Sequence, residues 1–81
     1  MQSLDLLLDV FLKADNKEKM KNLLEGILTP AEREELAQRI EIVRLLKEGV
    51  GQHKIAEKLG VGVATVSRGA KELKEGKFTY V

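Results

Sequence analysis

A chain of 81 residues has room for one small domain, and a domain of this size buries only about 60% of its unfolded surface, so it is marginally stable alone. It contains no cysteine and one histidine, which excludes a disulfide framework and argues against a zinc site, and no apolar run approaches the ~20 residues of a membrane span. The net charge of +1 combines eight basic and ten acidic residues in positions 1–50 with six basic and three acidic residues in positions 51–81, a basic end that permits nucleic-acid binding without establishing it.

The first predicted helix runs from a cap at Ser3 to about Ala14 and is apolar around most of its circumference. Its polar side chains, Asp5, Asp9 and Lys13, form a single stripe, and aliphatic residues and a phenylalanine fill the rest. A helix of this kind has to be buried on more than one side, and a short monomer has little with which to cover it. We therefore expect an intertwined dimer, with the central core helix of a monomer as the alternative.

The amino-terminal segment does not have the pattern of a signal peptide, because two aspartates interrupt it and no basic stretch precedes it. We expect a cytoplasmic protein without a membrane partner. The sequence DNKE at positions 15–18 has the form of a capping box with Asp15 as the cap, and it predicts a second helix that ends at Gly26.

A third helix begins at the sequence TPAE, with Thr29 as the cap, Pro30 at the first helical position and Glu32 reaching back to the cap. It is expected to run to about Glu48 and to stop at Gly49. Its predicted core face consists of four aliphatic residues: Leu36, Ile40, Val43 and Leu46.

Arg39 falls inside the apolar arc of this third helix when residues are placed at intervals of about 100°. A guanidinium that is buried without a partner is costly, so an anion is expected beside it. That anion is either a carboxylate of the same chain or the carboxylate of a ligand held by the planar guanidinium.

Two short helices with a glycine-containing turn are predicted near the carboxyl terminus. Their shared core consists of Ile55, Leu59, Val61 and Val66, with the small Ala56 where the helices cross. Gly60 suits the left-handed residue that ends the first of them, and Gly62 allows a sharp turn into the last helix, about residues 63–75. Helix, short turn and helix form the helix-turn-helix motif, with an ordinary helical hairpin as the alternative.

The last helix has a core stripe and an outer arc. The core stripe is Val63, Val66, Ala70 and Leu73, and the outer arc is Ala64, Thr65, Arg68 and Lys71. A recognition helix places such an outer arc against base edges and phosphates in the major groove. The expected organisation is a single domain, residues 1–81, with dimerisation helices at 1–26, a core helix at 28–49 and the helix-turn-helix at 51–75.

Gly69 lies in the middle of the last helix, where glycine costs about 1 kcal/mol relative to alanine. The missing side chain indicates either close packing against another helix or room for a ligand. The residue types and spacing alone leave these two explanations equal.

The sequences LTPAEREELAQRIEIVRLLKEG and QHKIAEKLGVGVATVSRGAKELK, which span positions 28–49 and 52–74, resemble the Trp repressor family. The resemblance covers more than half of the chain. It implies an all-α, intertwined helical homodimer with a carboxyl-terminal helix-turn-helix, which binds a palindromic operator in double-stranded DNA. It also implies L-tryptophan as a corepressor, bound between the core and the recognition helix.

Carried over by position, the resemblance implies that Arg39 and Arg68 flank the indole ring. Arg68 and Thr29 would contact the ligand carboxylate, and Gly69 would leave room beside the ring. The backbone around Gly26 and Leu28 would accept from the ammonium, and Glu72, where the family has a small hydroxyl residue, could pair with the ammonium or with Arg68. The DNA-binding residues implied are Gln52, His53, Val63, Ala64, Thr65, Ser67, Arg68, Lys71 and Lys74.

Several features depart from the family pattern. The turn before the helix-turn-helix is one residue shorter, and His53 and Ala56 stand where basic residues would touch phosphate. The amino-terminal arm and most of the last helix of the family are missing.

Three functional hypotheses follow, and none is an enzyme, because no nucleophile–base pair, metal cluster or glycine-rich phosphate loop stands out. The first is a DNA-binding repressor gated by L-tryptophan, with no other cofactor and no metal. The second is a ligand-independent dimeric regulator of the same family. The third is a protein-interaction module, since the region also resembles the DNA-reading end of a sigma factor.

Overall fold

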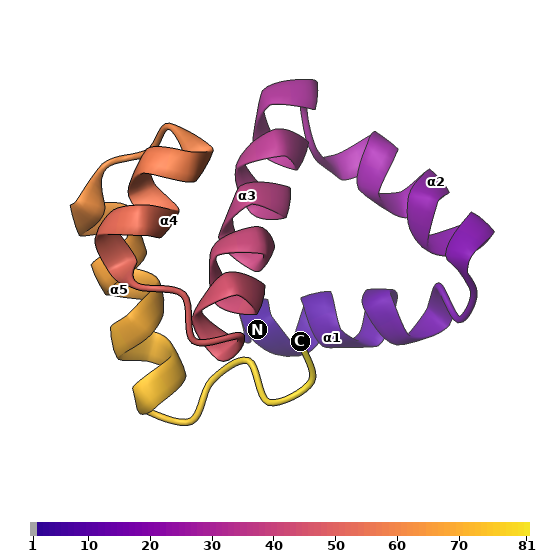
Figure 1. Cartoon of the computed structure of the whole chain (residues 1–81). Coiled ribbons are helices and arrows are strands. Elements are labelled where there is room, and N and C mark those ends of the chain that lie inside the picture. Colours follow the sequence, from indigo (N-terminus) through magenta and orange to yellow (C-terminus); the bar gives the residue numbers. More distant parts are fainter. Residues whose placement is uncertain (1) are drawn as a thin grey trace. The chain divides into compact units, whose positions relative to one another are not determined.

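The computed structural model describes residues 2–81, and these residues form five helices and no strand (Figure 1). The all-α prediction is therefore confirmed. The helices are α1 (Ser3–Lys13), α2 (Lys17–Ile27), α3 (Pro30–Lys47), α4 (Gln52–Leu59) and α5 (Val63–Lys74). They belong to two compact units, one that ends at Glu34 and one that comprises Glu35–Val81, so that α3 begins in the first unit and ends in the second. None of the helices in residues 2–81 combines the length and the apolarity needed to cross a membrane.

Helix α1 leaves its apolar residues uncovered within the chain. None of its residues is buried, and Leu4 and Leu12 are 66% and 77% exposed. The predicted cap at Ser3 is wrong, because the backbone of Gln2 has the extended conformation of a cap and Ser3 is already helical. A hydroxyl inside the first turn is badly placed to accept from the free N–H groups of that turn, and no side chain caps α1.

Helix α2 is capped one residue later than predicted. Asn16 has the extended backbone of a cap, and its Oδ1 accepts from the backbone N–H of Lys19 at 2.8 Å. Asp15 instead accepts from Lys19 Nζ at 3.0 Å, as an exposed ion pair. The helix also passes through Gly26 to Ile27, so the predicted stop at Gly26 is one residue early.

The start of α3 follows the predicted capping box. The backbone N–H of Glu32 donates to Thr29 Oγ1 at 3.2 Å, and the backbone N–H of Thr29 donates to Glu32 Oε1 at 2.9 Å. The pKa of Glu32 is lowered from its usual 4.5 by hydrogen bonds that stabilise the carboxylate. The larger cause is the hydrogen bond from the backbone of Thr29, and the smaller is the hydrogen bond with its side chain. The end of α3 at Lys47, before Gly49 at φ 85°, also agrees with the sequence to within one residue.

This capping box gives a testable pH dependence. A carboxyl group with a lowered pKa in the folded state adds stability above its unfolded pKa, and loses that contribution as the pH falls through the folded pKa. We expect the Glu32 carboxyl to titrate below 4.5 in a carbon-13 NMR experiment. The variant Thr29→Val should move the midpoint part of the way back, because it removes the hydroxyl and keeps the backbone donor. A wild-type midpoint at or above 4.5 would contradict the capping arrangement.

In the second unit, α4 and α5 lie beside the carboxyl-terminal part of α3 (Figure 1). The core that joins them consists of Ile42, Leu45, Ile55, Ala56 and Val66, with Leu46, Val50, Leu59 and Val61 packed around it. The predicted core of the two short helices is confirmed. The predicted face of α3 is partly wrong: Leu36 is exposed, whereas Ile42 and Leu45 are buried, because α4 and α5 cover the end of α3. Val63 is also exposed, at the first turn of α5.

The turn between α4 and α5 depends on one left-handed residue. Gly60 has φ 68° and ψ 35°, and its backbone N–H donates to the carbonyl of Ala56. A side chain in this conformation would be strained, which explains glycine here. Gly62, by contrast, is the extended cap of α5 at φ −69°, a value open to other residues.

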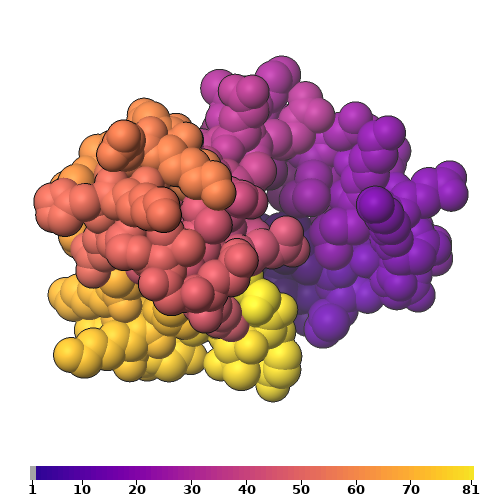
Figure 2. Space-filling view, in the orientation of Figure 1, coloured from indigo at the N-terminus to yellow at the C-terminus, as the bar shows by residue number. Residues whose placement is uncertain are grey.

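The residues after α5 fold back on the second unit, and the sequence analysis made no prediction for them. Gly76 reverses the chain at φ 93°, and Phe78 is also left-handed at φ 60°. Lys47 Nζ, at the end of α3, donates to the carbonyl oxygens of Phe78 at 2.6 Å and Val81 at 3.0 Å. In Figure 2 the yellow carboxyl-terminal residues lie against the segment that ends α3.

Candidate functional site

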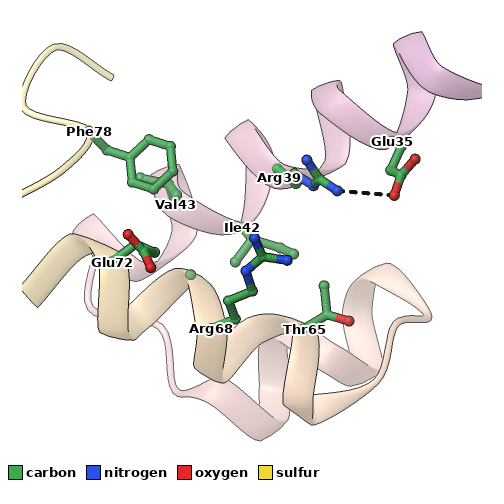
Figure 3. A pocket seen from close by; sticks show the side chains of 9 residues that line it. Glu35, Arg39, Ile42, Val43, Thr65, Arg68, Glu72 and Phe78 are labelled. Atoms are coloured by element: carbon green, nitrogen blue, oxygen red, sulfur yellow. Dashed lines mark hydrogen bonds and ion pairs between the residues drawn. The ribbon is translucent and has the colours of Figure 1, made fainter. Parts of the chain in front are cut away.

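A pocket of about 460 Å³ lies in the second unit between α3 and α5 (Figure 3). This volume falls within the ~300–1,000 Å³ that is usual for small-molecule sites. Its lining combines both signs of charge with apolar side chains. The lining residues are Glu35, Arg39, Ile42, Val43, Thr65, Arg68, Gly69, Glu72 and Phe78.

The sequence analysis expected the guanidinium of Arg39 to be buried, and the structure shows that it is not. Its side chain is 51% exposed, and its Nη2 donates to Glu35 Oε1 at 3.1 Å, one turn earlier on α3. Arg39 lines the pocket, and a long basic side chain commonly covers apolar surface with its stem while its charged end reaches solvent. The anion beside Arg39 in this structure is therefore a carboxylate of the same chain.

Arg68 differs from Arg39 in its pairing. It projects from α5 toward α3 in Figure 3, and it takes part in none of the three ion pairs found among residues 2–81. The half-buried Glu72, four residues later, lines the same pocket without forming an ion pair with it. The pocket thus contains one guanidinium that already has a partner and one that is open to an anion.

Gly69 lies where α5 crosses α3. A Cβ atom added to it would come within 3.2 Å of Ile42 Cγ2 and 3.8 Å of Leu46 Cδ1. The first distance is tighter than normal packing, so close contact between the helices is sufficient to explain glycine. Gly69 also lines the pocket, and room for a ligand beside it stays a prediction.

The residues predicted to face DNA are all exposed on α4 and α5: Gln52, His53, Val63, Ala64, Thr65, Ser67, Arg68, Lys71 and Lys74. Ser67 Oγ donates to Gln52 Oε1 at 2.6 Å, which ties the middle of α5 to the first residue of α4. Thr65 and Arg68 line the pocket as well. The pocket and the exposed face of α5 therefore share two side chains.

Three of the predicted ligand-binding residues lie in the first unit. Gly26 is in the last turn of α2, Leu28 is the extended cap that follows it, and Thr29 belongs to the capping box of α3. They are not among the residues that line the pocket of the second unit. Arg39, Arg68, Gly69 and Glu72 are the predicted ligand-binding residues that the structure brings together there.

Some lining residues were missed by the sequence analysis. Glu35 and Ile42 could have been found, because they lie four residues before Arg39 and three residues after it, on neighbouring turns of one helix. Phe78 carried no such signal, since only the fold of the chain after α5 brings it to the pocket.

Comparison with known proteins gives a consistent result. The family profile described as Trp repressor protein matches residues 2–81. A Trp operon repressor homolog of Vibrio cholerae is 44% identical over 68 residues, which are 83% of this chain and 66% of that protein. A Trp operon repressor homolog of Xylella fastidiosa is 39% identical over 78 residues, which are 95% of this chain and 85% of that protein.

The relatives differ in how much of their own length this chain matches. A Trp operon repressor homolog of Vibrio vulnificus is 53% identical over 53 residues, which are 64% of this chain and 52% of that protein. The chain therefore spans less than two thirds of the length of the two Vibrio relatives.

Proposed function

The chain belongs to the Trp repressor family, and on that premise we propose that it is a cytoplasmic, sequence-specific DNA-binding repressor whose affinity for a palindromic operator is raised by L-tryptophan. The family is regulatory and not enzymatic, so the prediction that the chain is not an enzyme is confirmed. The finer parts of the proposal are a homodimer, the operator and the corepressor.

The observation that carries the proposal is the pocket between α3 and α5. An amino acid zwitterion has one anionic group, one cationic group and a side chain. Arg68 is open to a carboxylate, Glu72 can accept from an ammonium, and Ile42, Val43 and Phe78 supply apolar surface. Such a mixture of apolar lining with a few convergent polar groups is typical of small-molecule sites.

The shared residues of the pocket and the exposed face of α5 suggest how a ligand would act. A ligand shifts a conformational equilibrium only through its different affinity for the two states. Because Arg68 and Thr65 belong to both surfaces, a ligand that holds Arg68 would favour one orientation of the α5 side chains over others. If that orientation fits the major groove, ligand binding strengthens operator binding.

The proposed DNA contacts predict different effects for two variants of α5. Thr65→Ala should change the preferred operator sequence, because a base contact carries sequence information. Lys71→Ala should weaken specific and random DNA alike and reduce the slope of the salt dependence by about one, because phosphate contacts release counterions. Lys71→Arg keeps the charge and should restore the slope.

Both variants are to be tested by fluorescence anisotropy on specific and random duplexes at several salt concentrations. Since Thr65 also lines the pocket, its variant is measured with and without saturating ligand. Equal losses on both duplexes for Thr65→Ala, at each ligand level, would contradict base recognition by Thr65.

A ligand-independent dimeric regulator is the second candidate, and two observations favour it. The pair between Arg39 and Glu35 satisfies one guanidinium without a ligand, and the contact of Gly69 with Ile42 explains glycine without a ring beside it. This candidate predicts the same DNA contacts and no response to L-tryptophan.

A further inference from the structure

We propose that Phe78 is an aromatic wall of the effector pocket and determines which side chain of an amino acid effector the pocket accepts, with Lys47 as the residue that positions this wall. The inference rests on the proposed function, because it concerns the effector of the same pocket. It goes beyond the residues implied by the family resemblance, none of which lies after α5.

The fold of the chain after α5 brings Phe78 to the pocket. The backbone N–H groups of Gly76 and Lys77 donate to the carbonyls of Leu73 and Glu72 at 3.1 and 3.0 Å, and they close the end of α5. Gly76 then reverses the chain, so that the half-buried Phe78 ring lies near Val43 of α3 (Figure 3). Phe78 and Glu72 thereby lie at one end of the pocket, and Glu35 and Thr65 lie at the other.

The backbone of Phe78 indicates that this position is held in place by its surroundings. A phenylalanine at φ 60° is in the left-handed region, which bulky side chains disfavour. Lys47 Nζ holds the segment by donating both to the carbonyl of Phe78 and to that of Val81. These two bonds join the end of α3 to a segment more than 30 residues later in the chain.

Phe78 acts as a wall of the pocket and does not fill it, because about 460 Å³ stays open with the ring in place. The charged groups that suit a zwitterion belong to Arg68 and Glu72, and the apolar surface belongs to Ile42, Val43 and Phe78. An effector held by its ionic groups would turn its side chain toward that surface. An aromatic ring prefers an aromatic partner in edge-to-face or offset packing, so Phe78 favours an aromatic effector over an aliphatic one.

The test is isothermal titration of the full chain, without DNA, with L-tryptophan and L-leucine. Phe78→Ala and Phe78→Gly should each weaken L-tryptophan binding by about tenfold and narrow its advantage over L-leucine, because both variants lose the ring–ring contact. Glycine adopts positive φ without strain, so Phe78→Gly removes the ring without straining the backbone. Comparing it with Phe78→Ala distinguishes the effect of the ring from an effect of backbone strain. Tyr80→Ala is the matched control, since Tyr80 is on the same segment and fully exposed, and it should bind L-tryptophan as the wild type does.

Each result of this titration has a definite meaning. If the wild type binds L-tryptophan and both Phe78 variants bind it as tightly as the wild type does, the proposed role of Phe78 is wrong and the proposed function stands. If only Phe78→Ala binds L-tryptophan more weakly, the effect comes from backbone strain, and the proposed role of the ring is again wrong. If the wild type binds no amino acid, the effector part of the proposed function fails, and this inference fails with it.

The positioning role of Lys47 has a separate readout. Lys47→Met keeps the aliphatic stem and removes the ammonium, so it removes both bonds to the segment. We expect faster amide hydrogen exchange at residues 77–81 and weaker L-tryptophan binding in the same direction as the Phe78 variants. Unchanged exchange and unchanged affinity would overturn the positioning role.

Discussion

Replacing Leu8 of α1 by glutamate is expected to dissociate the proposed homodimer and to lower operator affinity by a factor of about 10²–10⁴, the range that a second linked binding site adds. Within the chain no residue of α1 is buried, and its leucines and valine are exposed. Monomeric proteins seldom leave so large an apolar surface open, so a second copy of the chain is the partner we propose for it. A carboxylate placed in that interface would be buried without a partner.

Sedimentation equilibrium and fluorescence anisotropy on the palindromic duplex measure the two effects of Leu8→Glu. Asp9→Ala is the matched control, because Asp9 lies on the polar stripe of the same helix and should leave both the dimer and the DNA affinity unchanged. A folded wild-type monomer at micromolar concentration would contradict the dimer.

The second large effect is expected for Arg68→Met, which should weaken L-tryptophan binding about 10- to 150-fold, the usual loss when a hydrogen bond to a charged group is removed. Arg68 is the lining guanidinium without an ion pair among residues 2–81, so it is the one free to take the ligand carboxylate. Methionine keeps the apolar stem and removes the charge. Because Arg68 is also proposed to contact DNA, the titration is done without DNA.

Arg44→Met is the control for this experiment, since Arg44 is exposed on α3 and does not line the pocket. Arg39→Met should weaken binding less than Arg68→Met, because Glu35 already occupies the Arg39 guanidinium. Equal affinities for the wild type and Arg68→Met would contradict the proposed role of Arg68.

Local signals in the sequence predicted some helix ends correctly and missed others, such as the cap at Ser3 and the stop at Gly26. Thr29 with Glu32, and Gly60 in its left-handed conformation, are among those predicted correctly. The prediction failed where two neighbouring residues could cap the same helix: Asp15 and Asn16 both accept hydrogen bonds, and the backbone conformation selected Asn16. Propensity alone does not distinguish such neighbours.

Contacts between distant segments explain what the sequence could not predict about the site. Helix α3 is rich in aliphatic residues on several sides, and α4 and α5 decide that Ile42 and Leu45 are the ones buried. Gly69 packs on Ile42, so the variant Gly69→Leu would force α5 away from α3. Its effect on ligand binding would therefore not report on the ligand site alone. Phe78 reaches the pocket because the chain reverses at Gly76 after α5, and Lys47 bonds to the segment that follows.

The proposed gating by L-tryptophan is tested most directly by the operator dissociation constant of the wild-type chain, measured by fluorescence anisotropy with and without saturating L-tryptophan. A coupling of the usual size between two sites predicts that the constant falls by a factor of about 5–150 when L-tryptophan is present. An unchanged constant, together with no heat of L-tryptophan binding in a parallel titration, would contradict the gating and would favour the second candidate, a ligand-independent dimeric regulator.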